Sequence, residues 1–242
     1  MIDFEKFIKY QITQFGSFPH QEFYFLFQIT PYKSYHGVEH HKSTVILLGS
    51  SYDVFGKLYN EFLGVSSHEL YHVWNIKSIR PIQMHPYEFS KENYTHLGYV
   101  AEGVTTYMGD RMLYESGVFS KEDYFKELKT LLIRHFHNDG RHHYSVAESS
   151  WDTWLDGYVG RVPGRKASIY VEGALIAMIC DAKIRKQTNH EKSLHDVMKE
   201  LYSGSNLETN YDKERYKKTL EKISGIDFTD VFNDLIYGTK DF

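Results

Sequence analysis

Cysteine and proline are both scarce in this chain of 242 residues. The one cysteine, Cys180, cannot form a disulfide within the chain, so the fold does not depend on oxidation. The five prolines are scattered and mark no hinge or linker. The sequence therefore predicts one large domain, or two lobes packed closely together.

Long apolar runs are also missing. No segment approaches the roughly 18 apolar residues that a membrane-spanning helix needs, and the mean hydropathy is -0.49. A net charge of -4 supplies no surplus of lysine and arginine for nucleic-acid phosphates, which excludes a basic binding groove. The first residues, MIDFE, lack the pattern of a signal peptide, and the cytoplasm and the periplasm both stay open as compartments.

Imidazole and aromatic side chains are abundant, with 14 His, 20 Tyr and 16 Phe. Histidine supplies metal ligands and proton carriers, but abundance alone assigns no role. Several histidines occur in close pairs, among them His135 with His137. Their spacing fits no single helical face, which favours solvated or locally hydrogen-bonded side chains over a second metal site.

The order of the expected elements is strands first and helices afterwards. Aromatic and β-branched runs predict strands at 22–30 and 43–48, joined by a loop that contains Gly37 and Glu39. Helical spacing of apolar residues predicts helices at about 54–63, 66–80, 98–116, 120–137, 167–187, 193–202, 211–223 and 227–237. This order predicts an α+β fold with a small sheet lobe at about 1–50 and a larger helical lobe at about 51–242.

The motif that carries chemistry is HELYH, residues 68–72. On a helix, His68 and His72 stand one turn apart on one face, so both imidazoles can reach one metal ion. Glu69 lies beside that face, where a carboxylate can take a proton from water activated by the metal. The alternative is a helix with two histidines that are exposed or satisfied in the core.

A catalytic zinc site needs a third protein ligand from a second element. Glu102 lies between Ala101 and Gly103 in an apolar helical segment, where an unpaired carboxylate is costly to bury. A bound cation would compensate that cost, so Glu102 is the expected third ligand. Without the HELYH motif, an exposed helix carboxylate would be the favoured interpretation of Glu102.

The motifs then follow one another in an order that resembles a known family. HELYHVWNIKSIRP, GYVAEGVTTY, SVAESSWDTW and SIYVEGALIAMICDAKIR are similar to the catalytic domain of the glycyl aminopeptidase family of PDZ-carrying metallopeptidases. That family is related to the aminopeptidase N group among the gluzincins, which implies a thermolysin-like fold and a single catalytic domain over 1–242. The β domain and the PDZ domain that usually flank it do not fit within this chain.

The resemblance implies a role for each matching residue. It makes His68, His72 and Glu102 the ligands of Zn2+ and Glu69 the general base and acid. Tyr170 matches the tyrosine of the aminopeptidase N group that donates a hydrogen bond to the oxyanion of the reaction. A phenol can do this without being charged.

Two further residues are expected to bind the substrate. By position, Glu39 resembles the glutamate that holds the free amino group of the substrate in the aminopeptidase N group, although Val38 and His40 depart from that motif. Gly37 would let a backbone edge approach a peptide for strand-like pairing. From the residues alone, Glu39 could also be a solvated loop carboxylate.

The predicted function is zinc-dependent hydrolysis of peptides, with release of small N-terminal residues such as Gly or Ala. The expected partner is a peptide with a free N-terminus, and the oligomeric state is left open. An endopeptidase of the same fold and a catalytically silent peptide-binding domain are the alternatives. No Gly-x-Ser-x-Gly motif is present, which argues against a serine hydrolase.

Overall fold

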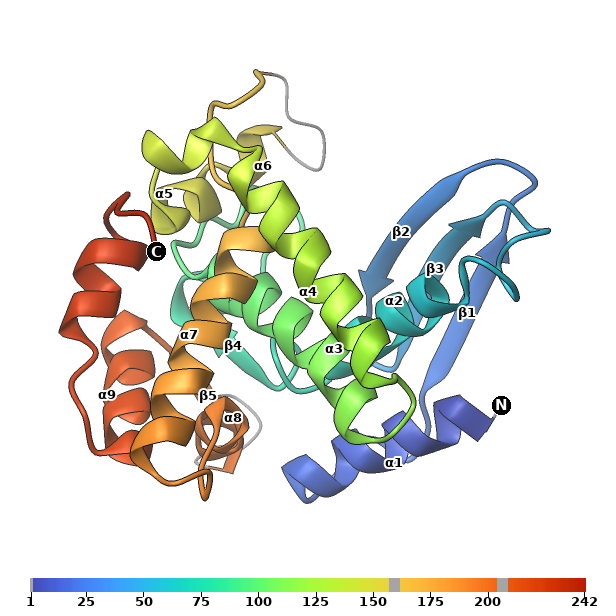
Figure 1. Ribbon diagram of the computed structural model, residues 1–242, viewed down its shortest axis with the longest axis horizontal. Coiled ribbons are helices and arrows are strands. Elements are labelled where there is room, and N and C mark those ends of the chain that lie inside the picture. Colours follow the sequence, from blue (N-terminus) through green and yellow to red (C-terminus); the bar gives the residue numbers. More distant parts are fainter. Residues whose placement is uncertain (1, 157–161, 204–208) are drawn as a thin grey trace. The chain divides into compact units, whose positions relative to one another are not determined.

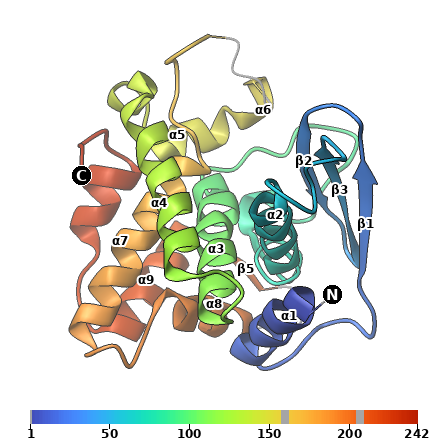
Figure 2. The ribbon, with the colours of Figure 1, turned by 45° about the vertical axis from the view of Figure 1, so that its right-hand side comes forward.

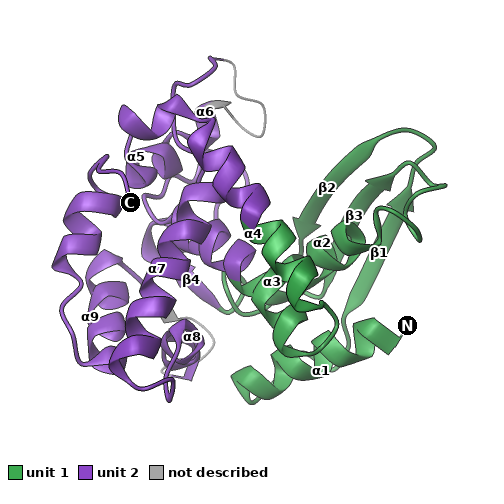
Figure 3. Cartoon of the chain, viewed as in Figure 1, with its two compact units in different colours: residues 1–78, 108–128 green, residues 79–107, 129–242 purple. Residues whose placement is uncertain are grey.

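The chain forms two compact units in the computed structural model, which describes residues 2–156, 162–203 and 209–242. Unit 1 contains residues 1–78 and 108–128, and unit 2 contains residues 79–107 and 129–242 (Figure 3). Each unit therefore joins segments that are distant in the sequence.

Unit 1 contains a three-stranded sheet of β1 (Tyr24–Ile29), β2 (Ser34–Glu39) and β3 (Ser43–Gly49). β3 is the central strand; it pairs parallel with β1 and antiparallel with β2 (Figure 1). The two expected strands are confirmed as β1 and β3. The expected loop between them is wrong, because it contains the edge strand β2, and Gly37 and Glu39 lie on that strand.

One face of this sheet packs against helix α2 (Tyr59–Tyr71), which carries the HELYH motif. On β3 the alternate residues Thr44, Ile46 and Leu48 are buried, as expected for a strand with one covered face. The helix α1 (Ile2–Phe15) also belongs to this unit, with Phe7, Gln11 and Phe15 buried at four-residue spacing; no helix was predicted there.

The single helix α2 replaces two predicted helices that were to meet near Gly64, with a cap at Ser66 or Ser67. Instead, Ser66 Oγ donates to the carbonyl of Phe62 one turn back, and Ser67 Oγ donates to the carbonyl of Gly109. The Ser66 hydroxyl is thus satisfied within α2 and the Ser67 hydroxyl by α3. Neither serine caps a new helix, and α2 continues through both without a break. The HELYH motif therefore lies at the end of α2, which stops at Tyr71; the prediction that this helix continues to about residue 80 is wrong.

Unit 2 is mainly helical, and α7 (Val171–Gln187) packs against several of its elements. Figure 2 shows α7 beside α8 and α9. The short strands β4 (Ile79–Pro81) and β5 (Thr209–Tyr211) pair in parallel. The remaining elements of unit 2 are η1 (Ile82–Met84), η2 (Tyr99–Val104), η3 (Asp139–His142), α5 (Val146–Trp151), α6 (Thr153–Asp156), α8 (Leu194–Ser203), α9 (Lys213–Ser224) and η4 (Val231–Ile236).

Two helices, α3 (Thr105–Glu115) and α4 (Lys121–Phe136), have residues in both units. The predicted cap of α4 is confirmed, because Ser120 and Asp123 exchange side-chain to backbone hydrogen bonds. Small sheets with a majority of helices confirm the α+β class. Within the described ranges, no helix combines the length and apolarity that crossing a bilayer requires.

Candidate metal centre

His68 and His72 lie at the carboxyl end of α2 with their rings turned toward each other. Their Nε2 atoms are 3.0 Å apart, and the ring centroids are separated by 4.7 Å. Nδ1 of His72 lies 3.0 Å from the carbonyl oxygen of Asn75. If Nδ1 carries the proton and donates it there, Nε2 is left as the nitrogen with a lone pair, the arrangement that metal-binding histidines use.

Glu69 lies between these histidines in the sequence and is 5% exposed. Oε2 of Glu69 accepts a hydrogen bond of 3.1 Å from the hydroxyl of Thr44 on β3. The carboxylate also lies close to Gly37 on β2, where a Cβ atom would stand 2.7 Å from Glu69 Cδ. Neither Thr44 nor this contact of Gly37 was predicted, because both depend on strand pairing that brings distant residues together.

Glu102 lies on η2, a π-helical segment that runs directly into α3. Single π-helical turns often occur at functional sites, because they alter the direction of a side chain within a helix. Among the described residues, one group of histidine and carboxylate side chains could together hold a metal ion, with one ligand atom from each. The group is His68, His72 and Glu102.

The segment that holds Glu102 packs tightly against α7 within unit 2. A Cβ atom on Gly173 would lie 2.8 Å from Gly103 Cα and 2.8 Å from the carbonyl oxygen of Tyr99. The two backbones can approach this closely only because both contact positions lack a side chain. Glycine at these positions therefore sets the distance between η2 and α7.

Tyr170 stands immediately before α7, and its carbonyl accepts the backbone N–H of Ala174 at 3.0 Å. The side chain is half-buried. Tyr170 thus directly precedes α7, the helix that packs against η2, and η2 carries Glu102.

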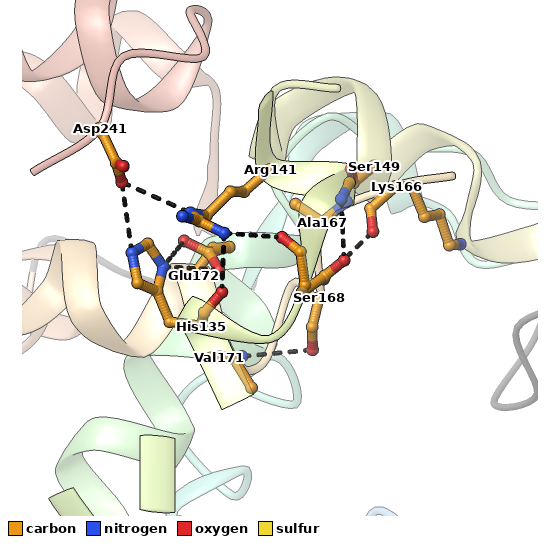
Figure 4. Close-up of polar contacts among 11 residues, drawn as sticks. His135, Arg141, Ser149, Lys166, Ala167, Ser168, Val171, Glu172 and Asp241 are labelled. Atoms are coloured by element: carbon orange, nitrogen blue, oxygen red, sulfur yellow. Dashed lines mark hydrogen bonds and ion pairs between the residues drawn. The ribbon is translucent and has the colours of Figure 1, made fainter. Parts of the chain in front are cut away.

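Glu172, two residues after Tyr170, is buried and paired with His135 of α4 (Figure 4). Nδ1 of His135 lies 2.8 Å and 3.0 Å from the two carboxylate oxygens. Burial raises the pKa of Glu172, and the neighbouring His135 opposes that shift. His135 is thus neither solvated nor bonded within its own segment, because its partner is 37 residues away on α7.

The other side of the His135 ring contacts the last residues of the chain. Nε2 lies 3.4 Å from Oδ1 of Asp241, and Phe242 stacks on the ring with centroids 4.9 Å apart. Arg141 Nε also lies 3.4 Å from Asp241, and this guanidinium is the largest cause of the lowered pKa of that carboxyl. These contacts connect the buried pair of His135 and Glu172 to the exposed residues Asp241 and Phe242 within unit 2.

Glu39 lies at the end of β2, and its Oε1 is 3.3 Å from Nζ of Lys77. The predicted binder of a substrate ammonium therefore already has a cation beside it. Cys180, to which no chemistry was assigned, is buried on α7, and burial raises the pKa of its thiol to about 12.

Comparison with known proteins shows which family and which solved structure this chain is similar to. Residues 61–176 match the family described as M61 glycyl aminopeptidase. The crystal structure of an aminopeptidase N family protein from Idiomarina loihiensis is similar over 100% of this chain, with a TM-score of 0.91 and 32% sequence identity. This chain spans 42% of that protein. A search of curated proteins found no match.

Proposed function

Since the chain belongs, over residues 61–176, to the M61 glycyl aminopeptidase family, we propose that it is a zinc-dependent peptidase that releases small N-terminal residues such as Gly and Ala. The observation that carries the proposal is the pair of Nε2 atoms of His68 and His72, 3.0 Å apart, beside a buried glutamate. The similarity to the aminopeptidase N family protein supports it. We also propose a thermolysin-like gluzincin fold for the single domain.

The donor set fits zinc. Two imidazole nitrogens and one carboxylate oxygen are the ligands found in one class of catalytic zinc sites, which keep the fourth position open. The two Nε2 atoms, 3.0 Å apart, are close enough to bind one ion together. His68, His72 and Glu102 would hold the ion. A zinc ion there supplies a Lewis acid that acidifies water and polarises the scissile carbonyl.

Different residues of the chain would then transfer protons, stabilise negative charge and bind the substrate. Glu69 takes the proton from the attacking water and passes it to the leaving amine. The hydroxyl of Tyr170 donates a hydrogen bond to the oxygen on which negative charge develops. Glu39 binds the substrate ammonium, and Gly37 allows the β2 edge to pair with the peptide backbone.

An endopeptidase is the second candidate, and the contact between Lys77 and Glu39 favours it. A neighbouring cation reduces the negative charge that Glu39 can offer to a substrate ammonium. Cleavage of an N-acetylated peptide at a rate close to that of the free peptide would support this candidate. The third candidate, a silent peptide-binding domain, would hydrolyse neither peptide.

The first test is metal content and hydrolysis. Purified protein, offered zinc and then dialysed, should contain about one zinc per chain by mass spectrometry, because three ligands bind one ion. Glu102→Ala should lose most of it, whereas the exposed Glu122→Ala should not. Glu69→Gln should keep zinc and lose hydrolysis of glycyl and alanyl substrates, because the general base is gone. A folded wild-type protein that binds no zinc would contradict the proposal.

A further inference from the structure

Thr44 is a polar residue on the buried face of the sheet in unit 1. It is 0% exposed and occupies the same row of β3 as the apolar residues Ile46 and Leu48. Burial of a hydroxyl costs free energy unless a hydrogen bond compensates the loss of water. The position therefore requires a partner for the hydroxyl, and the identity of that partner indicates what the residue does.

The hydroxyl of Thr44 has two acceptors at 3.1 Å, Oε2 of Glu69 and the carbonyl oxygen of Val38. A threonine hydroxyl has one proton, so it donates to one of them at a time. A carboxylate is a stronger acceptor than a backbone carbonyl, because hydrogen bonds to a charged group are shorter and stronger than those between neutral groups. Of the two acceptors, Glu69 is therefore the favoured one.

Gly37, on the neighbouring strand β2, limits the space that is available to the same carboxylate. It pairs with Ile46 across the sheet, and Thr44 pairs with Glu39, so Gly37 and Thr44 contribute to one face. A Cβ atom on Gly37 would lie 2.7 Å from Glu69 Cδ and 3.1 Å from Cγ. Any side chain at this position would displace the carboxylate of Glu69.

We propose that Thr44 and Gly37 are positioning residues for Glu69: Thr44 holds Oε2 by a hydrogen bond, and Gly37 leaves the space that the carboxylate occupies. This inference rests on the proposed function, in which Glu69 transfers the proton. A glutamate side chain has three rotatable torsions, and a displacement of about 1 Å from a reacting group can cost on the order of 100-fold in rate. The contacts with β2 and β3 remove that freedom before substrate binds.

A purely structural role makes a different prediction. If Thr44 served only to satisfy the carbonyl of Val38, its loss would lower stability and leave the turnover of folded protein unchanged. A positioning role requires that turnover fall while substrate binding and zinc content stay the same. The two roles therefore separate in kcat against KM.

The test compares Thr44→Val, which keeps the shape and removes the hydroxyl, with Thr44→Ser, which keeps the hydroxyl. We expect Thr44→Val to lower kcat on a glycyl substrate by about 10- to 100-fold, with KM within about twofold of wild type. Thr44→Ser should restore kcat to within about threefold. Zinc content and melting temperature are measured for each variant, so that loss of metal or of fold is recognised.

Gly37→Ala provides an arm that does not depend on Thr44. It should lower kcat in the same way, whereas Gly56→Ala should not, because a Cβ there meets its nearest neighbour at 3.7 Å. A kcat within about twofold of wild type for folded Thr44→Val or folded Gly37→Ala would overturn the inference. If Thr44→Val does not fold, Gly37→Ala is the deciding variant, and a kcat near that of wild type in folded Gly37→Ala would overturn the inference.

The failure of the proposed function has a separate signature. If wild-type protein hydrolyses no peptide, or if Glu69→Gln hydrolyses as fast as wild type, the proposed function fails and this inference fails with it. If Glu69→Gln is inactive while Thr44→Val keeps full kcat, only the positioning role is wrong.

Discussion

The hydrogen bond between His72 Nδ1 and the carbonyl of Asn75 shows how one local contact can prepare a ligand. Asn75 follows His72 by three residues, so the contact forms where α2 ends at Tyr71. With the proton on Nδ1, Nε2 is left available on the side of His68. At the residue scale, the local sequence supplies both the proposed ligand and a group that can orient it.

Glu39 is the residue whose proposed role has a direct competitor in the structure, because Lys77 lies 3.3 Å from its carboxylate. If Glu39 binds the substrate ammonium, Glu39→Gln should raise KM for a free peptide by about tenfold or more, since a charged hydrogen bond is lost. Hydrolysis of the N-acetylated peptide should not change. Steady-state kinetics on both peptides measures this, with Glu5→Gln on α1 as the control. An unchanged KM would remove Glu39 from the binding site.

At the element scale, the proposed site depends on the contact between η2 and α7. The π-helical segment carries Glu102, and α7 begins beside Tyr170, so their separation affects two residues of the proposed mechanism. The backbones meet at Gly103 and Gly173, where neighbouring atoms are main-chain atoms that cannot rotate away. Geometry at this contact is set by the absence of side chains.

Gly173→Ala should therefore destabilise the protein by about 1–3 kcal/mol, the usual cost of overpacking a tight contact. It should also reduce zinc content, because the added methyl group pushes against Gly103, the neighbour of Glu102. Denaturant unfolding and mass spectrometry measure the two effects. Ala182→Leu, an exposed position on the same helix, should change stability by at most about 0.5 kcal/mol. Equal stability of Gly173→Ala and wild type would show that the contact is loose.

At the scale of the whole molecule, the similarity over 100% of this chain contrasts with the 42% of the relative that it spans. The activity and substrates of a longer protein are accordingly proposals for this chain. The free energy of unfolding can be measured on this chain itself, and we expect one half-buried carboxyl, that of Asp110, to make it depend on pH.

Asp110 on α3 has a pKa raised to about 7 by desolvation and by the negative charge of Glu127. Its folded pKa lies above the ordinary aspartate value of 3.8, so the folded state binds the proton more tightly than the unfolded chain does. This contribution to stability is fully present below the unfolded pKa and is lost as the pH rises through about 7.

Asp110→Asn should abolish this part of the pH dependence, because its amide does not ionise. Relative to wild type, the variant should become progressively more stable as the pH rises from about 4 to about 7, and it should keep that gain above pH 7. Asp123→Asn is the contrasting control, because the pKa of Asp123 is lowered, mainly by the Ser120 side chain. Thermal unfolding across pH measures both variants. Parallel curves for Asp110→Asn and wild type would contradict the expectation.

The local sequence alone determined that HELYH is helical, that His68 and His72 are one turn apart, and that the class is α+β, because helical periodicity and the order of elements are local properties. It did not determine the bounds of that helix, which is observed as Tyr59–Tyr71. It also located most of the later helices, such as 120–137, which is observed as Lys121–Phe136.

Only the tertiary structure decided what lies around Glu69. The sequence predicts a loop where β2 is observed, because the pairing of β2 with β3 is non-local. Strand register is set by partners that the segment itself does not contain. The same holds for Thr44, which is separated from Glu69 by 25 residues, and for His135, which is separated from Glu172 by 37. A hydroxyl or an imidazole looks alike in the sequence wherever it occurs, and it acquires a role only when folding brings a partner within hydrogen-bonding distance.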